Sequence, residues 1–253
     1  MRKSKTLARF RNNETVRMCC LGHFIPAFVR HAAHFGFDCI WLDLEHRHID
    51  HAEVMTLLAH SHLHDIDIML RAPTLEKTKL YRYLEDGAAG LMIPHVSTPE
   101  KAKMLVDAVK YPPLGDRGVD GAGLDADYLL ETRYLEEVNR ETFLVVQIET
   151  PEAVANVDSI AAVPGVDGLF VGPGDLGLRL QHHTGELTLE SCFDQVAAAC
   201  KQHNTAWGTP VATPEILRQR QDQGGQLLAH GGEFRAIMNM LEKCGKAFES
   251  NRS

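Results

Sequence analysis

Charged and polar side chains stand at the downstream ends of several short apolar segments in this chain. His46, Arg71, Glu149 and Asp175 each follow a run rich in Val, Ile, Leu or Phe. If these runs are parallel strands of a barrel, their C-terminal ends share one rim, where barrel enzymes carry their chemistry. The pattern predicts an enzyme whose active site lies on that rim.

Glu149 and Asp175 are the strongest pair of candidate metal ligands. Two carboxylates on neighbouring strands, with no Cys or His beside them in sequence, suit a hard divalent cation such as Mg²⁺ or Mn²⁺ that keeps open water positions. The alternative is that each carboxylate only caps the helix that follows it. Glu149 precedes Thr150 and Pro151, an order that resembles a helix start.

His46, Arg71 and Gln147 could complete the chemistry. A histidine at a strand end can act as a general base near neutral pH, although many histidines are simply polar loop residues. The Arg71 guanidinium could neutralise an oxyanion or a carboxylate, or it could form a buried salt bridge under the rim. Gln147 precedes Glu149 by two residues, so both side chains point to the same side of a strand.

Eight strand-like segments alternate with helical patterns along the chain. The strand-like segments are apolar without alternation, as expected for strands that are buried on both faces. They cover residues 16–21, 38–42, 66–70, 90–93, 143–148, 168–171, 206–209 and 226–228. Amphipathic helical patterns cover residues 52–62, 75–86, 99–109, 152–163, 190–202 and 213–223.

This alternation predicts a single (β/α)₈ TIM barrel domain over residues 1–253. A doubly wound sheet is the alternative, but no Gly-x-Gly-x-x-Gly follows the first strand. The glycine-rich segment 111–123 is expected to help cover the rim. Residues 233–244 have an apolar helical face that needs a partner.

Composition narrows the possible partners and compartments. The formal charge is −8 and the isoelectric point is near 5.9, which argues against nucleic acid as the main partner. No apolar run reaches the length of a membrane span, so membrane attachment is not expected. The six cysteines show no Cys-x-x-Cys spacing, which favours reduced thiols in a cytoplasmic protein.

The lysines discriminate between two ways of stabilising a carbanion. All ten lie in the N-terminal segment or in or next to predicted helices, and none lies in a predicted strand. A Schiff-base mechanism therefore lacks its nucleophile at the rim. Metal-based chemistry is the expected alternative.

Six ordered motifs resemble the HpcH/HpaI family of metal-dependent pyruvate aldolases, which includes 2-dehydro-3-deoxyglucarate and 4-hydroxy-2-oxoheptanedioate aldolases. The motifs lie at residues 36–46, 70–73, 87–94, 111–118, 147–151 and 171–176. The resemblance implies a class II aldolase that cleaves a 4-hydroxy-2-oxo acid, such as a 2-keto-3-deoxy sugar acid, to pyruvate and an aldehyde. It also implies a homo-oligomer, a trimer or a hexamer, whose subunits exchange the last helix.

The resemblance assigns roles to individual residues. Glu149 and Asp175 would hold Mg²⁺, Mn²⁺ or Co²⁺, and His46 would be the base. Arg71 would stabilise the enolate, and Glu85 falls where the family has an acidic residue that raises the basicity of the histidine. Gln147, Gly174 and Asp175 would bind pyruvate, although the family commonly has Ala, Ser or Asn at the position of Gly174.

Departures from the family pattern lie after strands one, seven and eight, so the aldehyde partner stays open. Two other functions also remain. A lyase acting on coenzyme A thioesters would share the barrel and the carboxylate pair, and would need basic groups for the phosphates. A non-catalytic ligand-binding barrel would be expected to lack at least one of these site residues, and none is missing.

Overall fold

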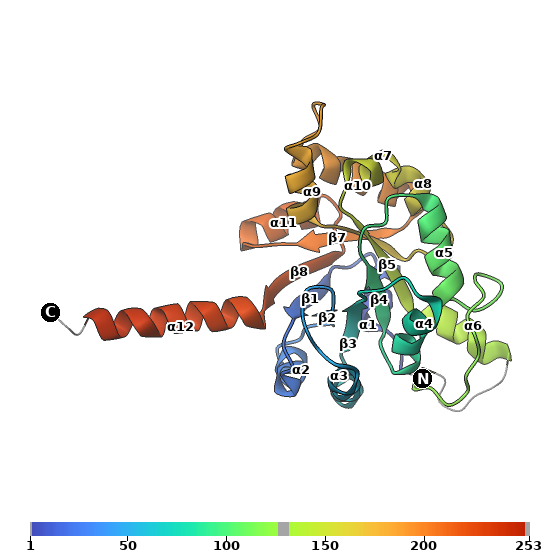
Figure 1. Ribbon diagram of the computed structural model, residues 1–253, viewed down its shortest axis with the longest axis horizontal. Helices are drawn as coiled ribbons and strands as arrows, with labels where there is room; N and C mark the ends of the chain where they lie inside the picture. The colour runs from blue at the N-terminus through green and yellow to red at the C-terminus, as the bar shows by residue number, and fades with distance from the viewer. Residues whose placement is uncertain (1, 126–131, 251–253) are drawn as a thin grey trace.

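The computed structural model describes residues 2–125 and 132–250, and these form a closed barrel of eight parallel strands surrounded by helices (Figure 1). Each strand pairs with the next one along the chain, and β8 closes the barrel against β1. The strands are β1 (Val16–Leu21), β2 (Cys39–Asp43), β3 (Asp67–Arg71), β4 (Gly90–Ile93), β5 (Phe143–Ile148), β6 (Gly168–Val171), β7 (Ala206–Pro210) and β8 (Leu227–Gly232).

Helices follow the strands and cover the outside of the barrel. Proline at the first turn and a preceding threonine begin several of them, as at Thr98 and Thr213, whose hydroxyls accept backbone N–H groups. The helices are α1 (Lys5–Arg11), α2 (Pro26–His34), α3 (His51–Leu63), α4 (Lys77–Glu85), α5 (Pro99–Val109), α6 (Thr132–Glu141), α7 (Pro151–Ala155), α8 (Val157–Ala161), α9 (Pro173–Leu180), α10 (Leu189–His203), α11 (Pro214–Asp222) and α12 (Glu233–Ser250).

The predicted TIM barrel is confirmed, and most element boundaries agree closely with the sequence pattern. β1, β4, β5 and β6 have the predicted bounds, whereas β8 continues to Gly232. The helix expected over residues 152–163 is two short helices, α7 and α8, separated at Asn156. The Asn156 side chain donates to the carbonyl of Ser97, which ties this break to the loop after β4.

Side chains of each strand alternate between the barrel interior and the layer beneath the helices. On β5, Phe143 and Val145 belong to the interior cluster, whereas Leu144 and Val146 pack against the helices. The same alternation carries Gln147 and Glu149 to the interior side at the C-terminal end of the barrel. Two layers of apolar side chains therefore support a polar layer at the rim.

The N-terminal segment, which the sequence pattern left outside the strand and helix assignments, is an ordered helix that closes the opposite end of the barrel. Leu7 of α1 belongs to the interior cluster, and Phe10 meets Phe143 edge-on with 6.5 Å between ring centroids. Asp67, at the start of β3, accepts hydrogen bonds from the Ser4 hydroxyl and the Thr6 N–H. These contacts hold α1 against the N-terminal end of the barrel.

The glycine-rich segment does not cover the rim, which corrects the expectation drawn from its sequence. Lys77 pairs with Asp116, and the Leu124 N–H donates to the Glu85 carbonyl. The segment from Asp116 to Leu124 therefore runs along the outside of α4. Part of the longer connection to α6, residues 126–131, lies outside the described residues.

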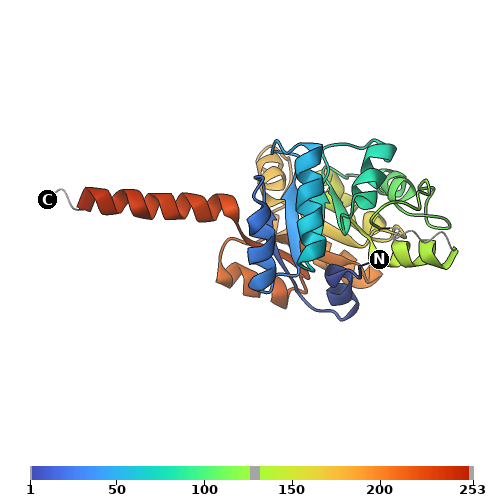
Figure 2. The same cartoon turned by 90° about the horizontal axis from the view of Figure 1, so that it is seen from below.

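The C-terminal helix α12 extends away from the barrel body (Figures 1 and 2). Its first turn is anchored: Glu233 accepts from the Gly22 N–H at 2.8 Å, and the Phe234 ring stacks on His23. Its large apolar side chains are exposed, namely Phe234, Ile237, Met238, Met240, Leu241 and Phe248. Within residues 2–125 and 132–250, no helix combines the length and apolar character that a membrane crossing requires.

Candidate active site

The C-terminal ends of β2 and β3 place an ion-paired arginine at the rim. Arg71 is buried and pairs side-on with Asp43, through Nε at 2.9 Å and Nη2 at 2.8 Å. Its Nη1 lies 3.1 Å from Oε2 of Glu45, and the guanidinium stacks over the Trp41 ring. The guanidinium is thus held by two carboxylates and an aromatic face, and it keeps further N–H groups for a ligand.

The loop after β2 is organised by Asp43. Its Oδ1 accepts the backbone N–H groups of Glu45 and His46. Burial raises the pKa of the Asp43 carboxyl, but the hydrogen bonds and charge of Arg71 outweigh burial and bring this pKa below its usual value. His46 is turned to the solvent, with 56 % of its side chain exposed and Nε2 3.5 Å from Oε2 of Glu45. A base in this position can reach a ligand above the rim.

β5 contributes a buried carboxylate and a buried amide. Gln147 is 1 % exposed, and its Oε1 is buried with no hydrogen-bond partner among the described residues. Glu149 is 3 % exposed, and its Oε2 accepts the backbone N–H of His95 at 3.1 Å. A buried acceptor without a donor is costly, so the Gln147 amide points to a ligand that completes this site.

Glu149 does not cap the helix that follows it. The Thr150 hydroxyl accepts the Ala153 N–H and begins α7, so the capping alternative is not needed for Glu149. Burial raises the pKa of Glu149, and the charges of Asp175 and Glu45 act in the same direction against the His95 hydrogen bond. A carboxylate held among other carboxylates in this way is suited to a cation.

Asp175 lies in the first turn of α9, directly above the end of β6. Its Oδ1 pairs with Nη1 of Arg179 at 2.7 Å, and 43 % of its side chain is exposed. The first turn of a helix favours a carboxylate in any case. The position of Asp175 therefore also fits the alternative in which this carboxylate only stabilises the start of α9. Gly174 beside it is open: a Cβ there would meet no atom within 4 Å among the described residues.

The donor set fits a hard divalent cation that keeps several open positions. Glu149 Oε1 makes no hydrogen bond with the described residues, and a Cβ on Gly172 would lie only 2.3 Å from it. Among the described residues, no three or more His, Cys, Asp and Glu side chains are grouped to hold a metal ion. The chain therefore offers a partial ligand set, which is the usual situation for Mg²⁺ with substrate and water completing the shell.

Glu85 lies apart from the other candidate residues. It ends α4 at the N-terminal end of the barrel, and its nearest cation is Arg117 at 3.9 Å. Burial raises the pKa of Glu85, which Arg117 opposes. The expected influence of Glu85 on His46 is therefore not produced within one chain.

Two rim residues were not assigned by the sequence analysis. His95 follows β4, and its ring lies between Glu45 and Glu149, with Nε2 3.6 Å from one carboxylate and Nδ1 3.3 Å from the other. Glu45 is the second, and it contacts both Arg71 and His95. The available signal was position alone, because His95 comes two residues after the last residue of an apolar strand, where the other candidates also stand.

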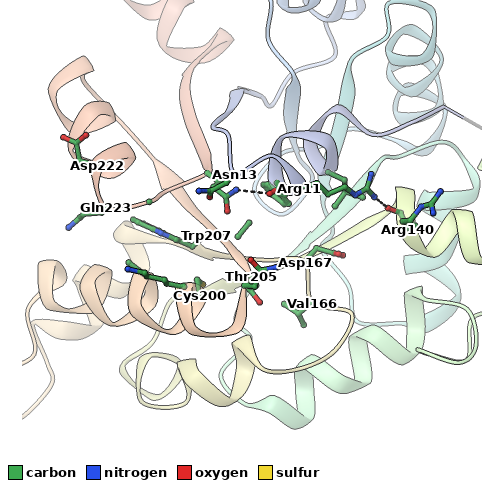
Figure 3. A pocket seen from close by; sticks show the side chains of 18 of the residues that line it. Arg11, Asn13, Arg140, Val166, Asp167, Cys200, Thr205, Trp207, Asp222 and Gln223 are labelled. Carbon is green, nitrogen blue, oxygen red and sulfur yellow. Dashed lines mark hydrogen bonds between the residues drawn. The ribbon is translucent and has the colours of Figure 1, made fainter.

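A cavity of about 820 Å³ lies at the other end of the barrel (Figure 3). It is lined by side chains of α1, α10 and the starts of β6 and β7, among them Arg11, Asp167, Cys200 and Trp207. None of the candidate rim residues lines it. The volume is therefore separate from the polar layer described above.

Residues 17–239 match the HpcH/HpaI aldolase/citrate lyase family. The chain belongs to this family. It is 39 % identical to a hydroxypyruvate/pyruvate aldolase of Sagittula stellata over 196 residues, 77 % of this chain and 78 % of that protein. It is 31 % identical to a 2-dehydro-3,6-dideoxy-6-sulfogluconate aldolase of Pseudomonas putida over 206 residues, 81 % of each chain.

A solved structure of this HpcH/HpaI family has the same fold. The HpcH/HpaI aldolase from Desulfitobacterium hafniense superposes with a TM-score of 0.88 at 29 % identity, covering 96 % of this chain and 95 % of that one.

Proposed function

We propose that this protein is a class II aldolase that cleaves a 4-hydroxy-2-oxo acid to pyruvate and an aldehyde. The observation that carries the proposal is the arrangement at β5. There, the buried Glu149 keeps Oε1 without a hydrogen bond among the described residues, and Gln147 keeps a buried amide oxygen without a partner. Family membership supplies the reaction class, and relatives named as aldolases of hydroxypyruvate, pyruvate and a deoxy sugar acid support it.

In this proposal, Glu149 and Asp175 hold the divalent cation, and Gln147 with the loop at Gly174 orients the 2-oxo acid. When bound, Mg²⁺, Mn²⁺ or Co²⁺ supplies a Lewis acid for the 2-oxo group. His46 removes the proton of the C4 hydroxyl as the C3–C4 bond breaks, and the aldehyde leaves. The C3 carbon of the remaining enolate then takes up a proton from solvent, which gives pyruvate. Arg71 donates N–H groups to the developing enolate oxygen.

The rigid pairing of Arg71 supports its role. Side-on contact with Asp43 and stacking on Trp41 fix the plane of the guanidinium before substrate arrives. Hydrogen-bond donors that are oriented in advance stabilise a developing charge without reorganisation in the transition state. A lysine cannot reproduce this two-point geometry.

The reaction can be tested with a panel of 4-hydroxy-2-oxo acids, with the released pyruvate measured by a coupled enzyme. We expect cleavage of at least one sugar-acid-like member by the wild type. His46→Ala should slow cleavage by about 10²–10⁴-fold. The exposed His182→Ala is the matched control and should retain the wild-type rate. No cleavage across the panel, or an unimpaired His46→Ala variant, would contradict this assignment.

The coenzyme A thioester alternative receives less support at the rim. The cation that the sequence offers beside Asp175 is Arg179, and the Asp175 carboxylate holds it in an ion pair. A phosphate of the coenzyme would have to compete with this pair. We therefore keep the free 2-oxo acid as the proposed substrate class.

We also infer that the protein is a cytoplasmic homo-oligomer, a trimer or a hexamer, in which α12 packs on a neighbouring subunit. An exposed apolar stripe on a helix that leaves its own barrel needs such a cover. The six cysteines are free thiols in the structure, as a reducing compartment favours. The double substitution Ile237→Glu with Leu241→Glu should lower the mass measured by light scattering, whereas the exposed Lys243→Glu should not. An unchanged mass in the double variant would contradict the exchange.

A further inference from the structure

His95 occupies a backbone conformation that is uncommon for residues other than glycine. Its φ is +55°, in the left-handed region that suits glycine or asparagine. Strained residues of this kind persist where the surrounding structure holds them, and they cluster at functional sites. At His95 the surroundings are known: Lys101 donates its Nζ to the His95 carbonyl at 2.7 Å, and the His95 N–H is bound by Glu149.

This conformation turns two groups of His95 toward the same carboxylate oxygen. The backbone N–H lies 3.1 Å and the ring Nδ1 3.3 Å from Oε2 of Glu149. β4 and β6 flank β5 in the barrel, so Glu149 is approached from both sides. His95 meets Oε2 from the β4 side, whereas Oε1 faces Gly172 at the end of β6. The two oxygens of Glu149 are thus directed to different neighbours.

The ring also connects two parts of the rim. Its Nε2 lies 3.6 Å from Oε1 of Glu45, whose other oxygen contacts Arg71. The His95 ring therefore fixes the distance between Glu45, which contacts Arg71, and Glu149. Groups that contact a metal ligand from outside the metal's own shell commonly set the orientation of that ligand.

We propose that His95 is a positioning residue of the metal site, which holds Oε2 of Glu149 so that Oε1 faces Asp175 and the cation. The inference rests on the proposed function, because it requires Glu149 to hold a metal. It goes further in assigning each oxygen of Glu149 a separate task and in giving a cause for the backbone strain at His95.

Binding of Mn²⁺ alone, followed by electron paramagnetic resonance of the free ion, tests the inference in the full-length protein. His95→Gly removes the ring but keeps the N–H and relieves the left-handed strain, so the variant should melt at or above the wild-type temperature. Its dissociation constant for Mn²⁺ should rise about 10-fold, the lower end for loss of a group that orients a ligand. His95→Asn can place an amide N–H near the former Nδ1 and should recover most of the affinity.

The matched control is Asn204→Gly at the C-terminal end of α10, another non-glycine residue with positive φ, at +53°. It should change the melting temperature without changing Mn²⁺ affinity. Glu149→Gln should abolish tight binding. If the wild type does not bind Mn²⁺, or Glu149→Gln binds it equally well, both the proposed metal site and the role of His95 are contradicted.

Two results would overturn the role of His95 alone. One is a His95→Gly variant that binds Mn²⁺ as tightly as the wild type while Glu149→Gln does not. The other is a ¹⁴N coupling to bound Mn²⁺ in the wild type that His95→Gly eliminates together with all tight binding, because His95 would then be a direct ligand.

Discussion

At the scale of single residues, Gly172 is what allows the Glu149 side chain to reach the rim. A Cβ at this position would stand 2.3 Å from Oε1 and 2.7 Å from Cγ of Glu149. The Glu149 side chain cannot simply swing away from such a Cβ, because the other oxygen of its carboxylate, Oε2, is held by His95. We predict that Gly172→Ala raises the dissociation constant for Mn²⁺ and lowers kcat/KM, each by at least about 10-fold.

The control for that substitution is Gly177→Ala, on α9, where a Cβ meets no atom within 4 Å among the described residues. It should leave metal affinity unchanged and favour the helix slightly. Equal affinities for Gly172→Ala and the wild type, measured by titration with Mn²⁺, would show that Glu149 adjusts freely.

The raised pKa of Glu149 leads to a prediction about stability. In the folded, metal-free protein this carboxyl keeps its proton to higher pH than in the unfolded chain. Stability is therefore lost as pH rises from near 4.5 through the raised pKa, and the ionised carboxylate destabilises the apoprotein above that range. Glu149→Gln removes this penalty and should raise the apoprotein melting temperature at pH 8.

The same comparison at pH 4 should show little difference, because the wild-type carboxyl is then protonated. Saturating Mn²⁺ should invert the order at pH 8, since only the wild type gains stability from binding. Calorimetry of both proteins under these three conditions gives the six melting temperatures. A variant that melts below the wild type in chelator at pH 8 would mean that Glu149 stabilises the apoprotein.

Single residues also show how far sequence reasoning reaches. Glu149 and Gln147 could be placed together because a two-residue spacing on a buried strand fixes their side. His95 could not be placed, because its role depends on β4 lying beside β5 and on a backbone conformation that the sequence does not reveal. Glu85 was assigned by resemblance alone, and its position at the end of α4 separates it from His46.

At the scale of elements, α1 is a short helix that is stabilised by its contacts with the end of the barrel that it covers. Seven residues form too short a helix to be stable in isolation, and four of them are Lys, Arg or Thr. Leu7 and Phe10 meet the interior cluster, and Asp67 binds the residues that precede and begin the helix. These long-range contacts explain why the sequence pattern missed α1, whereas β5 and β6 were recognised from continuous apolar runs.

We predict that Leu7→Ala destabilises the barrel without altering the rim. Truncation of a buried leucine costs about 2–5 kcal/mol, or roughly 5–15 °C of melting temperature in a chain of this size. The exposed Ala8→Ser should shift the melting temperature far less. At 25 °C, kcat/KM for cleavage should stay within about twofold of wild type in both, so a large loss of activity in folded Leu7→Ala protein would link the two ends of the barrel.

At the scale of the whole molecule, the two ends of the barrel carry different kinds of side chains. The N-terminal end carries α1, the cavity of Figure 3 and the buried Lys110, whose Nζ donates to the carbonyl of Thr142. The C-terminal end carries the polar side chains of the candidate site, namely Glu45, His46, Arg71, His95, Glu149 and Asp175. This polarity follows from the parallel topology, which the alternation of strands and helices made predictable.

The central claim is that the enolate is stabilised by a metal held on Glu149 and Asp175 and not by a lysine. Lys101 corrects the expectation that the rim has no lysine, because its Nζ donates to the His95 carbonyl. Burial lowers its pKa, so Lys101 is the residue to monitor in the alternative mechanism. The most direct test combines chelation with borohydride trapping in the presence of pyruvate. EDTA should abolish cleavage, Mg²⁺, Mn²⁺ or Co²⁺ should restore it, and mass spectrometry should find no covalent adduct. Full activity after exhaustive chelation, or a pyruvyl group trapped on Lys101 or any other lysine, would contradict the account.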